Sequence, residues 1–330
     1  MEQFRTIVPP LQGLHGTITH EKPIVMLGSC FTDNIGAKLQ ESLFNCSVNP
    51  MGTLYNPASI AVAIFDLLYE RDYTTSELFN HNGLWHSWSH HSRFSSSSPE
   101  EAVAKMNHSA AEARSLLKDA SALIVTFGTS YIFRLKEGRN VVANCHKMPA
   151  SMFDREFLQP SMAVNLWKKI LREIAARYPD LKVIFTVSPI RHLADGAHGN
   201  QLSKTALLTV IDRLVAEHPQ QAIYFPSYEI MLDDLRDYRF YAPDMVHPSS
   251  VAIDYIYTRF CESFMTDGTI ALCRENTKLF KRLSHRPLSS DAIDEKFIHD
   301  TNNLVNQILL SHPHLKPAID RLLLNKNAQC

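Results

Sequence analysis

Four short, mostly apolar runs, each followed by a helical pattern, constrain the fold of this 330-residue chain more than any other feature. The runs cover residues 24–27, 122–127, 182–187 and 222–225. Runs that are apolar on both faces are typical of parallel strands covered by helices on each side. The alternation predicts an α/β fold, a three-layer α/β/α sandwich with a doubly wound parallel sheet of four or five strands. We expect this domain over residues 1–266 and a helical C-terminal extension over residues 267–330.

The composition argues against several classes of protein. The chain has 33 Lys and Arg against 34 Asp and Glu and no basic stripe, so we expect no nucleic-acid partner. No apolar run approaches the ~20 residues of a membrane helix, and the first residues do not resemble a signal peptide. We therefore expect a cytoplasmic protein with no membrane partner. The six cysteines form no C-x-x-C pair, which favours reduced thiols over a disulfide framework.

The turn after the first run places two nucleophilic side chains between a strand and a helix. Gly28 allows a sharp turn, and Ser29 and Cys30 follow it directly. In an open parallel sheet, the carboxyl ends of the strands form the edge where ligands bind. We expect the next helix to begin at Asp33 and its dipole to lower the pKa of the Cys30 thiol, against the opposing charge of Asp33. The alternative is a tight turn with a buried cysteine and a capping serine.

A second group of candidate residues lies in the loop before the last helix of the domain. Asp244 and His247 are three residues apart, a spacing that lets the carboxylate reach the imidazole. Such a pair orients a histidine as general base and stabilises its cation. The chain order is then nucleophile, Asp, His. The alternative is an aspartate at a helix start and an ordinary polar histidine.

Residues 73–98 form an expected excursion from the core that is rich in aromatic side chains. Four histidines lie close to Trp85 in the sequence: His81, His86, His90 and His91. A metal site is one interpretation, but the spacing is irregular and no cysteine or carboxylate cluster accompanies them. A surface or substrate-contacting loop is therefore favoured. We also expect a short edge strand at residues 6–8 and a hairpin over residues 131–142.

The segment Gly28-Ser29-Cys30-Phe31 resembles the motif that names the GSCFA family, which belongs to the SGNH/GDSL hydrolase superfamily. The resemblance covers most of the chain. It aligns Cys30 with the superfamily nucleophile and Ser29 with the aspartate that precedes it, and both serve as candidates for the attacking group. It also implies that Asp244 and His247 complete a catalytic triad.

The resemblance extends to groups that bind an oxyanion or a substrate. Gly52 matches the glycine donor of the second superfamily block. Gly128-Thr129-Ser130 matches the third block, but Ser130 replaces its asparagine, and the shorter side chain weakens the expected oxyanion hole. Two further GSCFA-like segments hold candidates for the missing donor or for substrate contacts: Asn144, His146, Arg191 and His192. The alternatives for these residues are packed or ion-paired structural side chains.

These features predict a hydrolase of a small O-acyl ester, with a carbohydrate-linked ester as one option. The nucleophile forms a covalent acyl-enzyme, His247 takes its proton, and Asp244 orients His247. The N–H groups of Cys30 and Gly52 hold the oxyanion, and no cofactor or metal is required. The alternatives are an acyltransferase with the same residues, a catalytically inactive SGNH-like binding module, and a metal hydrolase that uses the histidines near Trp85.

Overall fold

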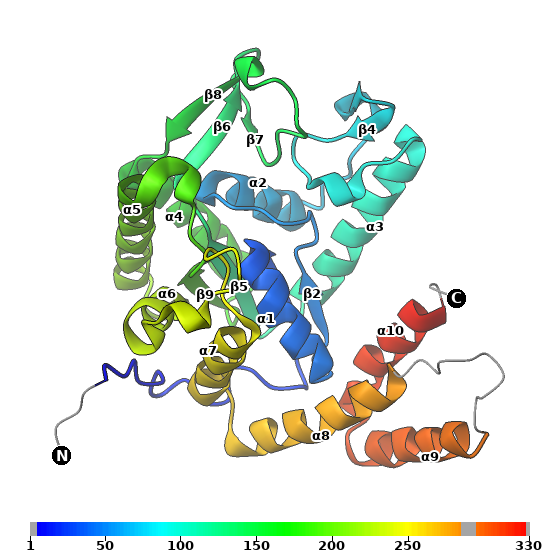
Figure 1. The fold of residues 1–330 in the computed structure, drawn as a ribbon. Coiled ribbons are helices and arrows are strands. Elements are labelled where there is room, and N and C mark those ends of the chain that lie inside the picture. Colours follow the sequence, from blue (N-terminus) through cyan, green and yellow to red (C-terminus); the bar gives the residue numbers. More distant parts are fainter. Residues whose placement is uncertain (1–4, 285–294, 328–330) are drawn as a thin grey trace.

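The computed structural model describes residues 5–284 and 295–327, and its centre is a five-stranded parallel sheet (Figure 1). The strands are β1 Ile24–Gly28, β2 Cys46–Val48, β5 Ala122–Phe127, β9 Lys182–Val187 and β10 Ala222–Tyr224. They lie in the order β10-β9-β5-β1-β2, and every neighbouring pair is parallel. The predicted doubly wound sheet is confirmed. Its strand order reverses between β1 and β5, which is where ligands bind in such sheets.

Helices cover both faces of the sheet. One face packs against α2 Pro57–Leu68, α3 Pro99–Leu117, α4 Pro160–Arg177 and α5 Gly196–Glu217. The other face packs against α1 Cys30–Glu41 and α7 Ser250–Phe264. Strand side chains alternate between the two cores: in β1, Val25 and Leu27 contact the first, whereas Ile24 and Met26 contact the second. The three-layer α/β/α sandwich predicted from the apolar runs is thus confirmed.

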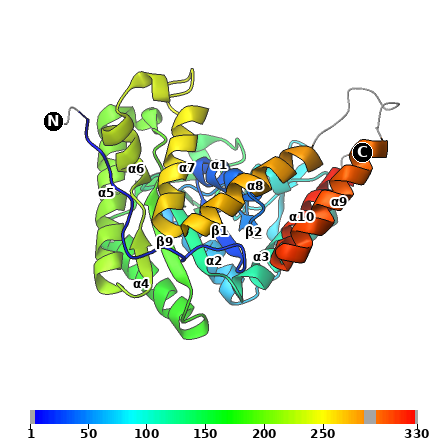
Figure 2. The same cartoon turned by 90° about the horizontal axis from the view of Figure 1, so that it is seen from below.

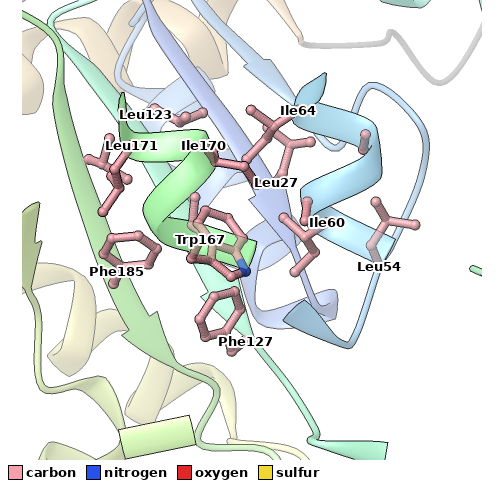
Figure 3. Close-up of a cluster of buried hydrophobic side chains, with 14 of the residues drawn as sticks. Leu27, Leu54, Ile60, Ile64, Leu123, Phe127, Trp167, Ile170, Leu171 and Phe185 are labelled. Carbon is pink, nitrogen blue, oxygen red and sulfur yellow. The ribbon is translucent and has the colours of Figure 1, made fainter. Parts of the chain in front are cut away.

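Trp167 of α4 lies at the centre of the larger core (Figure 3). Its fully buried ring is edge-on to Phe127 and Phe185, with centroid distances of 5.0 and 5.2 Å. The indole Nε1 donates a hydrogen bond of 3.1 Å to the carbonyl of Pro57, so its polar group is satisfied. Because Phe127 is the last residue of β5, this packing fixes the strand end that leads into Gly128.

Two small antiparallel sheets lie together at one end of the molecule, at the top of Figure 1. The first has the order β7-β6-β8 and consists of β6 Tyr131–Leu135, β7 Val141–Val142 and β8 Phe153–Phe157. The second pairs β3 Phe79–His81 with β4 Leu84–His86. The hairpin predicted over residues 131–142 is confirmed, and its turn contains Gly138 at a φ of 75°.

The C-terminal extension consists of α8 Asp267–Leu283, α9 Glu295–Ser311 and α10 Lys316–Asn327, which lie together at one side of the molecule (Figure 2). Its predicted helical character is confirmed for the described residues, and residues 285–294 and 328–330 lie outside them. Leu43, just after α1, packs with Leu279 and Ile319 of the extension. In addition, Arg321 donates a hydrogen bond of 2.8 Å to the carbonyl of Cys46. The extension therefore packs against the α1–β2 side of the main domain.

Two local expectations were wrong. Residues 6–8 form no strand, because the Asp234 carboxylate, rather than a neighbouring strand, binds this segment through the Val8 N–H and the Arg5 side chain. Helix α1 begins at Cys30 instead of Asp33 because Ser29 caps it. Within residues 5–284 and 295–327, no helix is both long and apolar enough to cross a bilayer.

Candidate active site

A cavity of about 580 Å³ lies beside the β1 and β5 ends, at the point where the strand order reverses. This volume is within the range of small-molecule sites. Several of the predicted site residues line it: Cys30, Asn144, Arg191, His192 and His247. The fold thus brings the loop after β1, the segment after β7, the loop after β9 and the Asp244–His247 loop to one cavity.

Cys30 reaches the cavity because it is the first residue of α1. Ser29 is the N-cap, and its hydroxyl accepts a hydrogen bond of 3.3 Å from the Phe31 N–H. Gly28 permits the turn, since a Cβ at this position would lie 2.4 Å from the Thr126 carbonyl. Ser29 is only 1% exposed and does not line the cavity, whereas Cys30 is partly exposed and does. The geometry therefore favours Cys30 over Ser29 as the accessible nucleophile.

The backbone N–H groups of Cys30 and Phe31 at the start of α1 lower the pKa of the Cys30 thiol, as expected, but two larger effects outweigh them. Burial raises this pKa, and the nearby Asp33 carboxylate raises it further. Asp33 is held in place by the side chains of Asn49 and Thr53, at 2.7 and 3.1 Å. Deprotonation of Cys30 thus needs help from a base or a cation in the cavity.

Asp244 and His247 form a hydrogen-bonded pair. Asp244 Oδ2 lies 2.7 Å from His247 Nδ1, and Oδ1 accepts from the N–H groups of His247 and Val246 at 3.0 and 2.9 Å. These bonds lower the pKa of Asp244 to about 2, so it is ionised at neutral pH. A neutral His247 therefore carries its proton on Nδ1, which leaves Nε2 as the basic nitrogen. Within the described residues, no hydrogen bond joins the Cys30 thiol to this imidazole.

His192 presents a second imidazole to the cavity. Its backbone N–H is bound by Asn200 Oδ1 at 2.9 Å, while its Nε2 is buried without a partner in the described part of the chain. A Cβ placed on Gly128 would lie 3.5 Å from this nitrogen and 3.4 Å from the Cβ of Ser29, so the ring lies close to the β1 turn. Burial lowers the pKa of His192 to about 4, with smaller effects from Lys204 and His247. His192 is accordingly neutral at pH 7.

Lys204 of α5 is a functional candidate that sequence reasoning missed. Its side chain is buried, and Nζ donates hydrogen bonds of 2.7 Å to the carbonyls of Gly128 and Ser188, which follow β5 and β9. Burial lowers the pKa of Lys204 to about 7, and the charge of Cys30 raises it. The available signal was a lysine on the apolar stripe of its helix, three residues before Leu207.

Three predicted oxyanion or substrate groups are engaged elsewhere. The Gly52 N–H donates to the Asn49 carbonyl at 2.7 Å. Ser130 is buried, and its hydroxyl donates to the Ser203 carbonyl at 2.9 Å. His146 is buried as well, and its Nε2 lies 2.8 Å from the Ser87 carbonyl. Gly52, Ser130 and His146 therefore do not line the cavity.

Asn144 is the remaining predicted donor, and it does line the cavity. Its Oδ1 accepts a hydrogen bond of 2.7 Å from the His146 N–H. The amide nitrogen of Asn144 is therefore the group left to donate to a substrate.

The histidines near Trp85 take part in an aromatic and hydrogen-bonded cluster. His86 contacts the Ser95 hydroxyl at 2.7 Å, and His90 contacts the Ser87 hydroxyl at 3.0 Å. His86 also packs against the His146 ring, with a centroid distance of 4.6 Å. Across residues 5–284 and 295–327, no three His, Cys, Asp or Glu side chains converge in a way that suits a metal ion. The arrangement gives the metal-hydrolase alternative no support.

A parallel sheet of order β10-β9-β5-β1-β2, with Cys30 at the start of a helix that Ser29 caps and an Asp–His pair near the switch point, defines an SGNH-like α/β protein. Comparison with protein families matches the GSCFA family over residues 23–260, and the chain belongs to that family. The matched region spans the whole central sheet and most of α7, and it ends before the extension. A comparison with curated proteins gives no match.

Proposed function

We propose that this protein hydrolyses a small O-acyl ester through a covalent thioester on Cys30. The observation that carries the proposal is the single cavity shared by Cys30 and the imidazole of His247, which Asp244 orients at 2.7 Å. A nucleophile, a base and a group that orients the base are the parts of a hydrolytic triad.

In the proposed reaction, the Cys30 Sγ attacks the ester carbonyl while His247 Nε2 takes the thiol proton. The C–O bond then breaks, the proton passes from His247 to the leaving alcohol, and the acyl group stays on sulfur. Water attacks this thioester with His247 again as base, which releases the carboxylic acid and restores the thiol. The raised pKa of the Cys30 thiol makes His247 necessary, because little thiolate exists before substrate binds.

The oxyanion hole of this proposal differs from the one expected from sequence. Its donors are the Cys30 N–H at the start of α1, the His192 Nε2–H and the amide nitrogen of Asn144. A neutral imidazole suits the role, since His192 keeps one N–H donor without adding a charge to the buried wall. Gly52 has no part in it, because its N–H is already bonded.

Two alternatives use the same cavity. An acyltransferase needs only an alcohol in place of water. An inactive binding module is favoured by the loss of Gly52 and Ser130 as donors.

The proposed mechanism also bears on the location of the protein. A reducing compartment such as the cytoplasm would keep Cys30 as the free thiol that the mechanism requires.

The test is reaction with p-nitrophenyl acetate, followed by intact mass and peptide mapping. We expect one acetyl group on Cys30, which disappears in Cys30→Ala and decreases strongly in His247→Gln. Cys145→Ser is the matched control, since Cys145 lines the same cavity and burial raises its pKa to about 11. Equal acetylation of Cys145, or none on Cys30, contradicts the proposal. Faster release of p-nitrophenol with an added alcohol, together with an acetylated alcohol product, indicates the transferase.

A further inference from the structure

A second cavity, of about 420 Å³, adjoins the first and shares Arg191 and Leu193 with it. Its other walls come from the π-helical segment Ile230–Leu235 with the residues that follow it, from Ala197 of α5 and from Met245. Met245 belongs to the loop that carries Asp244 and His247. Because His247 returns a proton to the leaving alcohol, the alcohol part of the ester lies on the side of this loop.

Two tyrosines give the second cavity flat, amphipathic faces. Tyr238 is 78% exposed, and its ring centroid lies 6.3 Å from that of Tyr241. Both line the cavity, and an interaction with Tyr241 raises the pKa of Arg191 on the shared wall. Rings of this kind pack their faces against the apolar C–H groups of a ligand ring and bind polar groups through their hydroxyls.

The wall of this cavity also carries a net positive charge, with the two guanidinium groups of Arg191 and Arg236 against the one carboxylate of Asp237. Neither Arg191 nor Arg236 has a carboxylate partner among residues 5–284 and 295–327. The acidic residue of the wall, Asp237, is engaged: it accepts a hydrogen bond of 2.9 Å from the Arg239 N–H and lies 3.9 Å from that residue's guanidinium. Guanidinium groups match the planar geometry of a carboxylate.

The backbone around this cavity is strained. Arg236 ends the π-helical segment in a left-handed conformation with φ 43° and ψ 29°, and Met245 has a φ of 57°. Non-glycine residues in this region, like π-helical turns, concentrate at ligand sites, where the strain fixes side chains in place. The two strained residues line the same cavity from different segments of the chain.

We propose that the second cavity binds the alcohol part of the ester as a ring that carries a carboxylate, an acidic sugar such as a uronic acid. The ring lies on Tyr238 and Tyr241, and the carboxylate pairs with Arg191 and Arg236. The apolar walls of the first cavity, which include Phe133, then take the acyl group. The statement that the ring is the alcohol part of an ester rests on the proposed function. The statement that the second cavity binds an acidic sugar does not.

The test is calorimetric titration of the full-length protein with methyl β-D-glucuronide and methyl β-D-glucoside. We expect the glucuronide to bind at least about tenfold more tightly, and Arg236→Gln to remove that difference. Tyr238→Ala should weaken both ligands. Arg172→Gln is the matched control, because Arg172 is an exposed arginine of α4 that does not line the cavity. Thermal melts check that each variant folds.

The outcomes separate this inference from the hydrolase proposal. Equal binding of the two glycosides, no binding of either, or the same loss in Arg172→Gln as in Arg236→Gln overturns the inference. If Cys30 is acetylated but the glucuronide does not bind, the hydrolase proposal is supported and the acidic-sugar site is contradicted. If the glucuronide binds in an Arg236-dependent way but Cys30 is not acetylated, the acidic-sugar site is supported and the hydrolase proposal is contradicted.

Discussion

Lys204 and Asp33 act on the Cys30 thiol in opposite directions. Asp33 raises the pKa of the thiol, and the Lys204 ammonium lowers it, although burial of the thiol is the largest effect. A thiolate at Cys30 in turn raises the pKa of Lys204, so the two charges stabilise each other. In the proposed mechanism, Lys204 thus acts on Cys30 without any contact with the substrate, because Lys204 does not line the cavity.

We expect Lys204→Met to slow alkylation of Cys30 by iodoacetamide by about threefold or more at neutral pH, because removal of the cation raises the pKa of the thiol. The variant also leaves the Gly128 and Ser188 carbonyls without a donor, which costs about 1–3 kcal/mol of stability each. Peptide mapping over a pH series measures the rate, and Cys145 in the same molecule is the internal control. An unchanged pH profile for Cys30 in a folded variant contradicts this role.

We expect Asp244→Asn to lower turnover of p-nitrophenyl acetate by about 10² to 10⁴ while the fold stays intact, because the amide no longer holds the His247 imidazole or stabilises its cation. Steady-state kinetics measure the effect. Asp254→Asn is the comparison, since Asp254 pairs with Lys38 on the surface, away from the cavity. If both variants keep wild-type turnover, Asp244 has no catalytic role.

Among the elements, the β1–α1 turn is a closely packed junction of the site. A Cβ at Gly28 would meet the Thr126 carbonyl at 2.4 Å, and its φ of 154° disfavours a side chain as well. We expect Gly28→Ala to destabilise the protein by about 2–5 kcal/mol through overpacking and strain. Gly268→Ala in α8 is the control, because its Cβ meets nothing closer than 3.8 Å. Urea unfolding measures both, and equal midpoints would show that the turn relaxes easily.

How far the sequence predicts these elements depends on the range of the interactions that form them. The strands were predictable because an unbroken apolar run indicates burial on both faces. The Asp244–His247 pair was predictable because its hydrogen bond joins residues only three positions apart. Helix α1 was placed three residues late because the capping role of Ser29 is not visible in the apolar pattern. The positions of Ser130 and His146 were not predictable, since their partners Ser203 and Ser87 lie 73 and 59 residues away.

At the scale of the whole molecule, buried neutral histidines recur in three separate regions. His20 stacks on Phe44 and lies 3.2 Å from Asn276 of α8, so it joins the main domain to the extension. In the second region, His146 packs against Trp88 and His90 packs edge-on to Tyr73 and Phe94, and in the third His192 lines the first cavity. Burial is the largest effect on each, and it lowers their pKa values to about 3 for His90 and about 4 for the other three.

These shifts predict the direction in which acid acts on stability. A base whose pKa is lower in the folded state binds protons first in the unfolded state, so the free energy of unfolding falls as pH drops from 6.5 towards 4. Between pH 7 and 5.5 we expect a loss of about 1 kcal/mol per buried histidine. Urea unfolding at the two pH values measures it. His90→Gln should reduce this loss of unfolding free energy by the contribution of one buried histidine. His108→Gln should leave the loss unchanged, because the His108 side chain is 78% exposed. Equal pH dependence in wild type and His90→Gln would show that His90 is already protonated in the folded protein or is not shielded from water.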